Sequence, residues 1–421
     1  MIRIDAEVMI PGRGDPVTDG SVVMDGNLIR YAGPTAGAPS EGVTDTVRVP
    51  AVMPGMWECH GHFMGERSAD LAALATVDPV LIGLRVAADA AAALDAGFTS
   101  VREVGGAGVH LRRAVDEGTN VGPHVYGAGA ILSPTGGHAD LHMYPVGWVH
   151  DLAERTGLLH NCDGVPECLR AVRLQLRKGA RLIKICASGG VMSEVDHPIH
   201  QQFSAEELRV IVEEAARAER VVAAHCHGKP GIVAALEAGV RTIEHGTYLD
   251  EETAAMMREL DAVLVPTRLV VTELMNHGRR VGLPDYAFRK LEQVAEHHAD
   301  AVALAIERGV TIALGTDVST TGAHLPCHWG QNGEELALLA KAGMSALQAV
   351  EAATANGPLT LGPQAPRAGV LTEGYDADVI AVASNPLEDL AILGDPDSIT
   401  WVWKAGEVVK RPGGSGPAAR P

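Results

Sequence analysis

From about residue 52 to residue 364, short apolar runs alternate with longer stretches that have the amphipathic pattern of helices. This alternation is typical of repeated strand–helix units, whose strands form a parallel sheet. Eight such runs follow one another, and eight parallel strands favour closure into a barrel. We therefore predict an α/β fold, a (β/α)8 TIM barrel, with strands over residues 52–59, 99–102, 124–130, 181–187, 221–226, 241–244, 262–267 and 311–315.

The segments that flank the predicted barrel have β character. Residues 1–52 contain short β-type runs separated by turns, and residues 365–410 contain further apolar runs, the last of which has the pattern of a hairpin. Pairing the two segments in one small β-sandwich beside the barrel would protect their strand edges. We predict that 1–52 and 365–410 form this sandwich, that 53–364 form the barrel, and that the Gly- and Pro-rich tail 411–421 is disordered.

The charge balance and the apolar pattern exclude several classes of partner. The chain has 34 basic and 53 acidic residues, a formal net charge of −19, and such a field repels nucleic acid and anionic lipid. No run of 18 apolar residues occurs, and the first residues lack a basic segment followed by an apolar one. The six cysteines are scattered and read as reduced thiols. We expect a cytoplasmic protein that binds neither nucleic acid nor membrane.

Polar side chains stand at or just after the ends of five of the predicted strands. In a barrel the carboxyl ends of the strands meet on the catalytic face, so residues far apart in sequence converge there. The candidates are His60, His62, Lys184, His225, His227, His245 and Asp317. Other histidines, including His297 and His298, are expected to be solvated.

Lys184 lies inside an apolar strand, where a buried ammonium group is costly. Carboxylation by carbon dioxide would convert its amine into a carboxylate able to bridge two cations, with imidazoles and Asp317 as the other ligands. Two such ions can share a hydroxide and polarise a carbonyl group. Asp317 is the candidate proton shuttle. Zinc is the default ion, although manganese, iron and cobalt accept the same ligands.

The order of these motifs resembles the amidohydrolase superfamily over nearly the whole chain: His-x-His at the first strand, Lys at the fourth, His at the fifth and sixth, and Gly-Thr-Asp at the eighth. Four segments are more specific and resemble the Xaa-Pro/Xaa-Arg dipeptidase and ochratoxinase-like group, which is related to imidazolonepropionases. They are Ser133-Pro134-Thr135-Gly136-Gly137-His138, Ile183-Lys184-Ile185-Cys186-Ala187-Ser188-Gly189-Gly190, His225-Cys226-His227-Gly228 and Glu244-His245-Gly246-Thr247.

The resemblance implies a role for each matching residue. The more buried ion would be held by His60, His62 and Asp317, the other ion by His225 and His245, and Lys184, N6-carboxylated, would bridge the two divalent ions. The resemblance also implies that His138 and His227 contact substrate and that the chain forms a homo-oligomer. Phe203 stands where some relatives carry tyrosine, so a hydroxyl contact to substrate is expected to be missing.

The leading functional hypothesis is hydrolysis of an amide bond in an N-acyl amino acid or dipeptide-like small molecule. A metal-bound hydroxide would attack the carbonyl carbon, and Asp317 would pass the proton to the leaving amine. The same chemistry serves a cyclic amide, a lactone, a carbamate or a phosphonate ester, and the fold cannot discriminate among them. A non-catalytic barrel scaffold is disfavoured because every ligand position is filled, and a mononuclear deaminase is disfavoured because it would not need Lys184.

Overall fold

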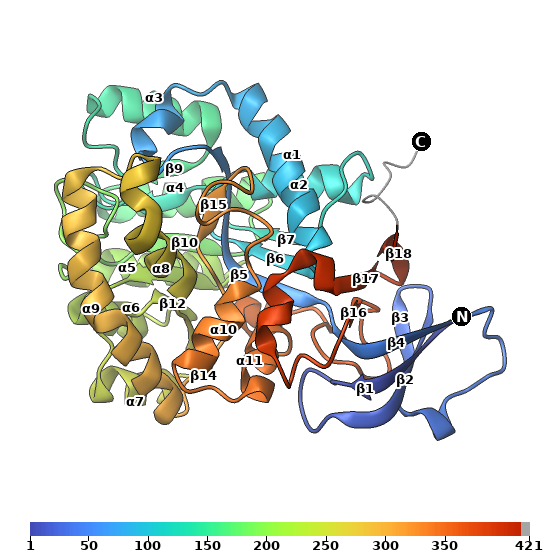
Figure 1. Cartoon of the computed structure of the whole chain (residues 1–421). Helices are drawn as coiled ribbons and strands as arrows, with labels where there is room; N and C mark the ends of the chain where they lie inside the picture. The colour runs from blue at the N-terminus through green and yellow to red at the C-terminus, as the bar shows by residue number, and fades with distance from the viewer. Residues whose placement is uncertain (414–421) are drawn as a thin grey trace.

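The computed structural model describes residues 1–413 of the 421-residue chain. Most of the tail 411–421, for which disorder is predicted, lies outside the described residues. A β domain built from both ends of the chain lies beside a larger barrel surrounded by helices (Figure 1). Among residues 1–413, no helix is both long enough and apolar enough to cross a membrane.

The β domain is one continuous seven-stranded sheet in the order β18-β17-β16-β4-β1-β2-β3. The N-terminal and C-terminal segments of the chain meet in this sheet, where β4 pairs with β16 in antiparallel register and Met53 lies opposite Ile380. Along β16, Ile380 and Val382 face a cluster shared with the barrel, while Val379 and Ala381 face the domain's own apolar cluster. The strands are β1 (Ile2–Met9), β2 (Val17–Asp25), β3 (Leu28–Pro34), β4 (Asp45–Pro54), β16 (Val379–Val382), β17 (Ile399–Lys404) and β18 (Glu407–Lys410).

The barrel strands run parallel to one another. They form two hydrogen-bonded groups. Backbone hydrogen bonds join the groups at both seams: Cys59 N donates to Leu314 O (2.9 Å) at one, and Arg181 N donates to Gly127 O (2.8 Å) at the other. The predicted TIM barrel is therefore confirmed. Its strands are β5 (Met56–Glu66), β6 (Phe98–Glu103), β7 (His124–Gly127), β10 (Ile183–Cys186), β11 (Val222–Cys226), β12 (Thr242–His245), β13 (Val263–Val265) and β14 (Thr311–Ile312), with the short strands β8 (Ile131–Ser133), β9 (Leu159–Asn161) and β15 (Val318–Thr320) near the site.

Helices follow most barrel strands and cover the outside of the barrel (Figure 1). Capping boxes formed by Ser204 with Glu207 and by Ser345 with Gln348 begin α5 and α11. The helices are α1 (Pro79–Asp95), α2 (Gly108–Asp116), α3 (Val146–Thr156), α4 (Gly164–Lys178), α5 (Ala205–Ala216), α6 (Lys229–Glu237), α7 (Glu251–Glu259), α8 (Arg268–His277), α9 (Asp285–Glu307), α10 (Glu334–Lys341) and α11 (Ala346–Ala353). Six short 3₁₀ helices are η1 (Thr35–Gly37), η2 (Leu71–Ala75), η3 (Gly278–Val281), η4 (Pro358–Gln364), η5 (Leu390–Gly394) and η6 (Pro396–Ser398).

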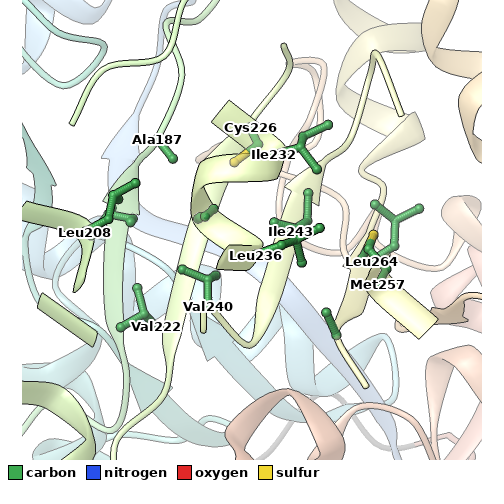
Figure 2. Close-up of a cluster of buried hydrophobic side chains, with 14 of the residues drawn as sticks. Ala187, Leu208, Val222, Cys226, Ile232, Leu236, Val240, Ile243, Met257 and Leu264 are labelled. Carbon is green, nitrogen blue, oxygen red and sulfur yellow. The ribbon is translucent and has the colours of Figure 1, made fainter. Parts of the chain in front are cut away.

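Two apolar layers hold the barrel together. Between strands and helices, Val222, Ile243 and Leu264 of neighbouring strands pack against helix residues such as Leu208 and Leu236 (Figure 2). Another buried cluster, below the site, joins residues of several strands: Trp57, Leu182, Ala223, Val263, Val265 and Ala313. Close packing of this kind makes the strand ends a rigid platform.

Three strand predictions are wrong in their bounds. The predicted strand 311–315 ends at Ile312. The predicted strand 52–59 is divided at Gly55, because residues 52–54 belong to β4 of the β domain and β5 begins at Met56. The predicted strand 124–130 ends at Gly127, and Gly129 adopts a positive φ of 77° before β8 begins. Such a backbone turn favours glycine, and it lets β8 pair with β10 while β7 pairs with β6. The domain boundaries at 52 and 364 stay predictions.

Asp89 supplies a pH-dependent contact between α1 and the loop that follows β15. Its Oδ2 accepts a 2.7 Å hydrogen bond from Thr321 Oγ1, and burial raises its pKa to about 7. A raised carboxyl pKa stabilises the fold fully below the unfolded pKa, and this stability is lost as pH rises toward 7. We expect Asp89→Asn, which cannot ionise, to gain about 2–4 kcal/mol in unfolding free energy relative to wild type between pH 4 and 8. Urea denaturation at both pH values tests this; a pH-independent difference would contradict it.

Candidate active site

Strand alternation brings the predicted metal ligands to one place. On β10 and β11, Lys184 and His225 stand two residues after Leu182 and Ala223, which belong to the buried cluster below the site. Since residues i and i+2 of a strand share a face, Lys184 and His225 point into the barrel one level higher. All six predicted ligands and both predicted substrate residues line one cavity: His60, His62, Lys184, His225, His245, Asp317, His138 and His227.

His60, His62 and Asp317 form one end of the cluster. Asp317 Oδ1 lies 3.1 Å from His62 Nε2 and 3.5 Å from His60 Nε2. His62 Nδ1 donates to Gly105 O (2.8 Å), which directs Nε2 toward Asp317. Asp317 adopts a φ of 65°, and its backbone N donates to His60 O (2.7 Å). This strained backbone is held by the neighbouring strand, a pattern concentrated at functional sites.

His225, His227 and His245 form the other end. The rings of His225 and His245 lie 4.6 Å apart, and the His227 ring stacks on that of His245 at 4.9 Å. His225 Nε2 donates to Gly189 O (3.2 Å), which leaves Nδ1 as its free ligand atom, while His227 Nδ1 lies 2.8 Å from Thr247 Oγ1. Burial lowers the pKa of each of these imidazoles, so they are neutral, the form that binds metals.

Lys184 lies between these two ends. Its side chain is 2% exposed and its Nζ is 3.5 Å from His60 Nε2. Burial lowers the pKa of the Lys184 amine and lowers that of His60 to about 4. A buried lysine beside a neutral imidazole is therefore biased toward its uncharged amine.

Two groups of ligand atoms in the described part of the chain are close enough to hold a metal ion, one formed by His60, His245 and Asp317 and the other by His225, His227 and His245. The second group includes His227, which the sequence analysis assigned to substrate. Borderline divalent cations favour such imidazole and carboxylate sets, so the residues fit metal binding. The division of ligands between two ions and the substrate roles of His138 and His227 stay predictions.

A buried ion pair lies beside the cluster. Arg102 on β6 donates through Nη2 to both carboxylate oxygens of Glu244 on β12 (2.8 and 2.7 Å), and both side chains are 0% exposed. Glu244 Oε2 in turn accepts from His60 Nδ1 (2.7 Å), which fixes the ring and leaves His60 Nε2 toward Lys184. Burial raises the pKa of Glu244, but the Arg102 guanidinium and the hydrogen bond from His60 outweigh burial and hold that pKa far below its ordinary value.

His138 is held by a tethered loop. Its Nδ1 lies 2.8 Å from Ser193 Oγ, and its ring stacks on that of His225 with centroids 4.2 Å apart. Ser193 Oγ also donates to Asp196, and Lys290 on α9 donates to the backbone oxygens of Gly190 and Ser193 (3.2 and 2.7 Å). The loop that carries Ser193 is thereby fixed against α9, and it holds His138 at the cavity.

The cavity above the cluster is lined mainly by apolar side chains. Two separate apolar clusters contribute to its lining. The first includes Met64, Leu71, Leu74, Ile131, Leu141 and Leu159, and the second includes Ala69, Val191, Val271, Leu291 and Val294. Besides the predicted site residues, the polar or ionisable side chains of the lining are Glu66, Ser68, Ser319, Thr320, Cys186 and Cys327. Phe203 is fully buried in the barrel core and does not line the cavity.

Sequence reasoning missed several residues around the ligands. Arg102 and Glu244 are charged residues inside apolar strands, where a buried charge is as costly as at Lys184, and this is the sequence signal for both. His298, expected to be solvated, is fully buried and its Nε2 donates to His245 O (3.1 Å). Burial lowers the pKa of His298 to about 3. The signal for His298 was weak, because its neighbour His297 on the same helix is exposed.

The profile of the Amidohydrolase family matches residues 51–409, most of the chain. The chain belongs to the Amidohydrolase family. It is 44% identical to ochratoxinase from Aspergillus niger over 425 aligned residues, which cover 97% of this chain and 87% of that protein. The crystal structure of the A. niger ochratoxinase matches this amidohydrolase with a TM-score of 0.91 at 42% identity, covering 100% of this chain and 98% of that one.

Further solved structures extend the comparison. A prolidase complexed with N-methylphosphonate-L-proline is 32% identical with a TM-score of 0.88, covering 97% of this amidohydrolase and 99% of that chain. A Xaa-Pro dipeptidase with methionine bound in its active site is 30% identical with a TM-score of 0.86, covering 97% and 99%. The resemblance stated from the motifs is thus confirmed: this amidohydrolase is a hydrolase similar to ochratoxinase and to prolidases.

Proposed function

We propose that this amidohydrolase cleaves the amide bond that joins an acyl group to an amino acid, in a small molecule whose two halves are both large and apolar. The observation that carries the proposal is the cluster of six ligand-type side chains at the floor of a cavity lined by two separate apolar clusters. Apolar walls with a few polar groups at the reacting centre are typical of small-molecule sites. The similarity to ochratoxinase and to prolidases supports amide chemistry.

The proposed metal centre consists of the six ligands that the family resemblance implies. His60, His62 and Asp317 would hold one divalent ion and His225 and His245 a second, with N6-carboxylated Lys184 between them; zinc is the proposed ion. The neutral amine of Lys184 is the form that reacts with carbon dioxide, which supports this role. Bound divalent ions lower the pKa of water and polarise carbonyl groups.

The chain's own residues complete the reaction. Asp317 lies between the two first-strand histidines, where its carboxylate can take the proton of the attacking water and pass it to the leaving nitrogen. Glu244 and Arg102 hold His60 in orientation. His138 and His227 line the cavity and are proposed to contact the substrate carboxylate or acyl oxygen.

A substrate panel tests this function. N-acyl amino acids and dipeptides with phenylalanine, leucine or proline at the carboxyl end would be compared with lactones, carbamates and phosphonate esters. We expect the highest kcat/KM for amides with apolar groups on both sides of the bond, and a loss of at least about tenfold when the amino acid is glycine. Turnover confined to lactones or phosphonate esters would contradict the proposed function.

A further inference from the structure

Glu66 is a buried carboxyl group that the proposed chemistry does not use. It is the last residue of β5, four positions after His62, and it is 9% exposed. Its Oε2 accepts a 2.8 Å hydrogen bond from Ser319 Oγ, whereas its Oε1 is buried without a hydrogen-bond partner. A buried polar atom without a partner destabilises the fold, so its presence in the structure needs a physical explanation.

The position of Glu66 separates it from other such atoms. The described residues contain several buried side-chain nitrogen and oxygen atoms without a partner, and Glu66 Oε1 is the one whose residue lines the active-site cavity. Apart from Asp317, Glu66 is also the only carboxyl residue among the described lining residues. Burial raises the pKa of Glu66 to about 7. A cationic hydrogen-bond donor in the cavity would satisfy Oε1 and favour the carboxylate form.

The polar side chains at the floor of the cavity form a continuous row. Ser319 connects Glu66 to the Asp317 and His62 end of the ligand cluster, because Asp317 is two residues away and lies 3.1 Å from His62. From His62 the rings continue through His60, His245 and His225 to His138, at centroid distances of 5.3, 4.9, 4.6 and 4.2 Å. A carboxyl group thus stands at one end of the row and an imidazole at the other.

From this arrangement we propose that Glu66 binds a hydrogen-bond donor on the acyl half of the substrate, and that this donor is the α-ammonium group of a dipeptide. The inference rests on the proposed amidase function and narrows it from N-acyl amino acids to substrates with a free amine. Glu66 accepts from the amine through Oε1, and Ser319 holds the carboxyl group through Oε2. Glu66 is thus a specificity residue that touches the substrate.

Three substrates that differ in one group test the proposal: leucyl-phenylalanine, 2-hydroxy-4-methylpentanoyl-phenylalanine and 4-methylpentanoyl-phenylalanine. They carry an ammonium group, a hydroxyl group and no donor at the same position. We expect wild-type kcat/KM to fall in that order. Glu66→Gln should lower kcat/KM for leucyl-phenylalanine about 10- to 100-fold, mainly through KM, the size expected for a hydrogen bond to a charged group. The compound without a donor should change less than about twofold.

Glu103→Gln is the matched control. Glu103 is also fully buried, has an unpartnered Oε2, and has a pKa that burial raises to about 7, but it does not line the cavity. Any effect of Glu103→Gln should be equal for the three substrates. An equal effect of Glu66→Gln on all three substrates would overturn the proposal. The preference of the wild-type enzyme for the ammonium compound is a second readout that needs no folded variant, and its absence would also overturn it.

The failure of this inference can be told apart from the failure of the proposed function. Efficient hydrolysis of all three compounds with no preference leaves the amidase standing and removes the role of Glu66. If none is hydrolysed, the proposed amidase function fails for this class, and calorimetric dissociation constants of the three compounds decide the role of Glu66. Tighter binding of the ammonium compound that Glu66→Gln abolishes would support the subsite, and equal binding would overturn it.

Discussion

Replacing Asp317 with asparagine is expected to lower kcat about 10²- to 10⁴-fold, the range for loss of a positioned general acid or base. The carboxylate lies within 3.5 Å of both first-strand imidazoles, and it is the group proposed to carry the proton to the leaving nitrogen. Burial raises the pKa of Asp317, but the neighbouring imidazoles of His60 and His62 outweigh burial and hold that pKa below its ordinary value. The carboxylate is therefore ready to accept a proton at neutral pH.

The measurement for Asp317→Asn is single-turnover hydrolysis of an apolar dipeptide, together with the metal content of the variant. Asparagine keeps the size of the side chain, so the melting temperature should stay close to that of wild type. Asp196→Asn is the control for the loss of a buried carboxylate near the cavity. Asp196 holds the loop of Ser193 and contacts none of the predicted ligands in the described structure. Full kcat in Asp317→Asn with an unchanged metal content would exclude Asp317 as the proton carrier.

Arg102→Met should be the most destabilising single change near the site. Arg102 donates to Cys59 O (2.5 Å), to Thr242 Oγ1 (2.8 Å) and to Glu244, and all of it is buried. Removing one partner of a buried ion pair leaves the other charge uncompensated and costs about 3–5 kcal/mol. Chemical denaturation of the wild type and the variant gives this difference. A loss below about 1 kcal/mol, the usual value for an exposed pair, would contradict the buried network.

A double variant separates the two roles of the Arg102 and Glu244 pair. In Arg102→Met with Glu244→Leu no buried charge is left unpaired, so part of the lost stability should return. Activity should stay low, because the double variant removes the Glu244 carboxylate that orients the ring of His60 through Nδ1. Recovery of both stability and activity would show that Glu244 does not position His60.

The convergence of the predicted ligands could be predicted from the sequence, because the alternation of strands and helices is enough to place the strand ends on one face. Lys184, His225 and Asp317 each close or follow a strand, and parallel strands of a barrel end on one face. The family motifs then supplied the roles, which pattern and spacing could not. The pairing of β4 with β16 was also predictable in outline, since both ends of the chain have β character.

Tertiary contacts decided what the sequence could not predict. The end of β7 depends on Gly129, whose turn is fixed by packing against Gln175 of α4 and by the pairing of β8 with β10. The unpartnered Oε1 of Glu66 is visible only once β15 brings Ser319 to the end of β5. The buried position of His298 follows from the face of α9 that packs on the barrel, and its hydrogen bond to His245 O needs coordinates.

The most direct test of the proposed centre is the metal content and activity of Lys184→Ala beside wild type, measured with and without short-chain carboxylic acids. The proposed bridge predicts about two divalent ions per chain in wild type, loss of both metal and amide hydrolysis in the variant, and partial return of activity when a small carboxylate replaces the missing bridge. One ion or none in wild type, with hydrolysis indifferent to Lys184→Ala, would contradict it.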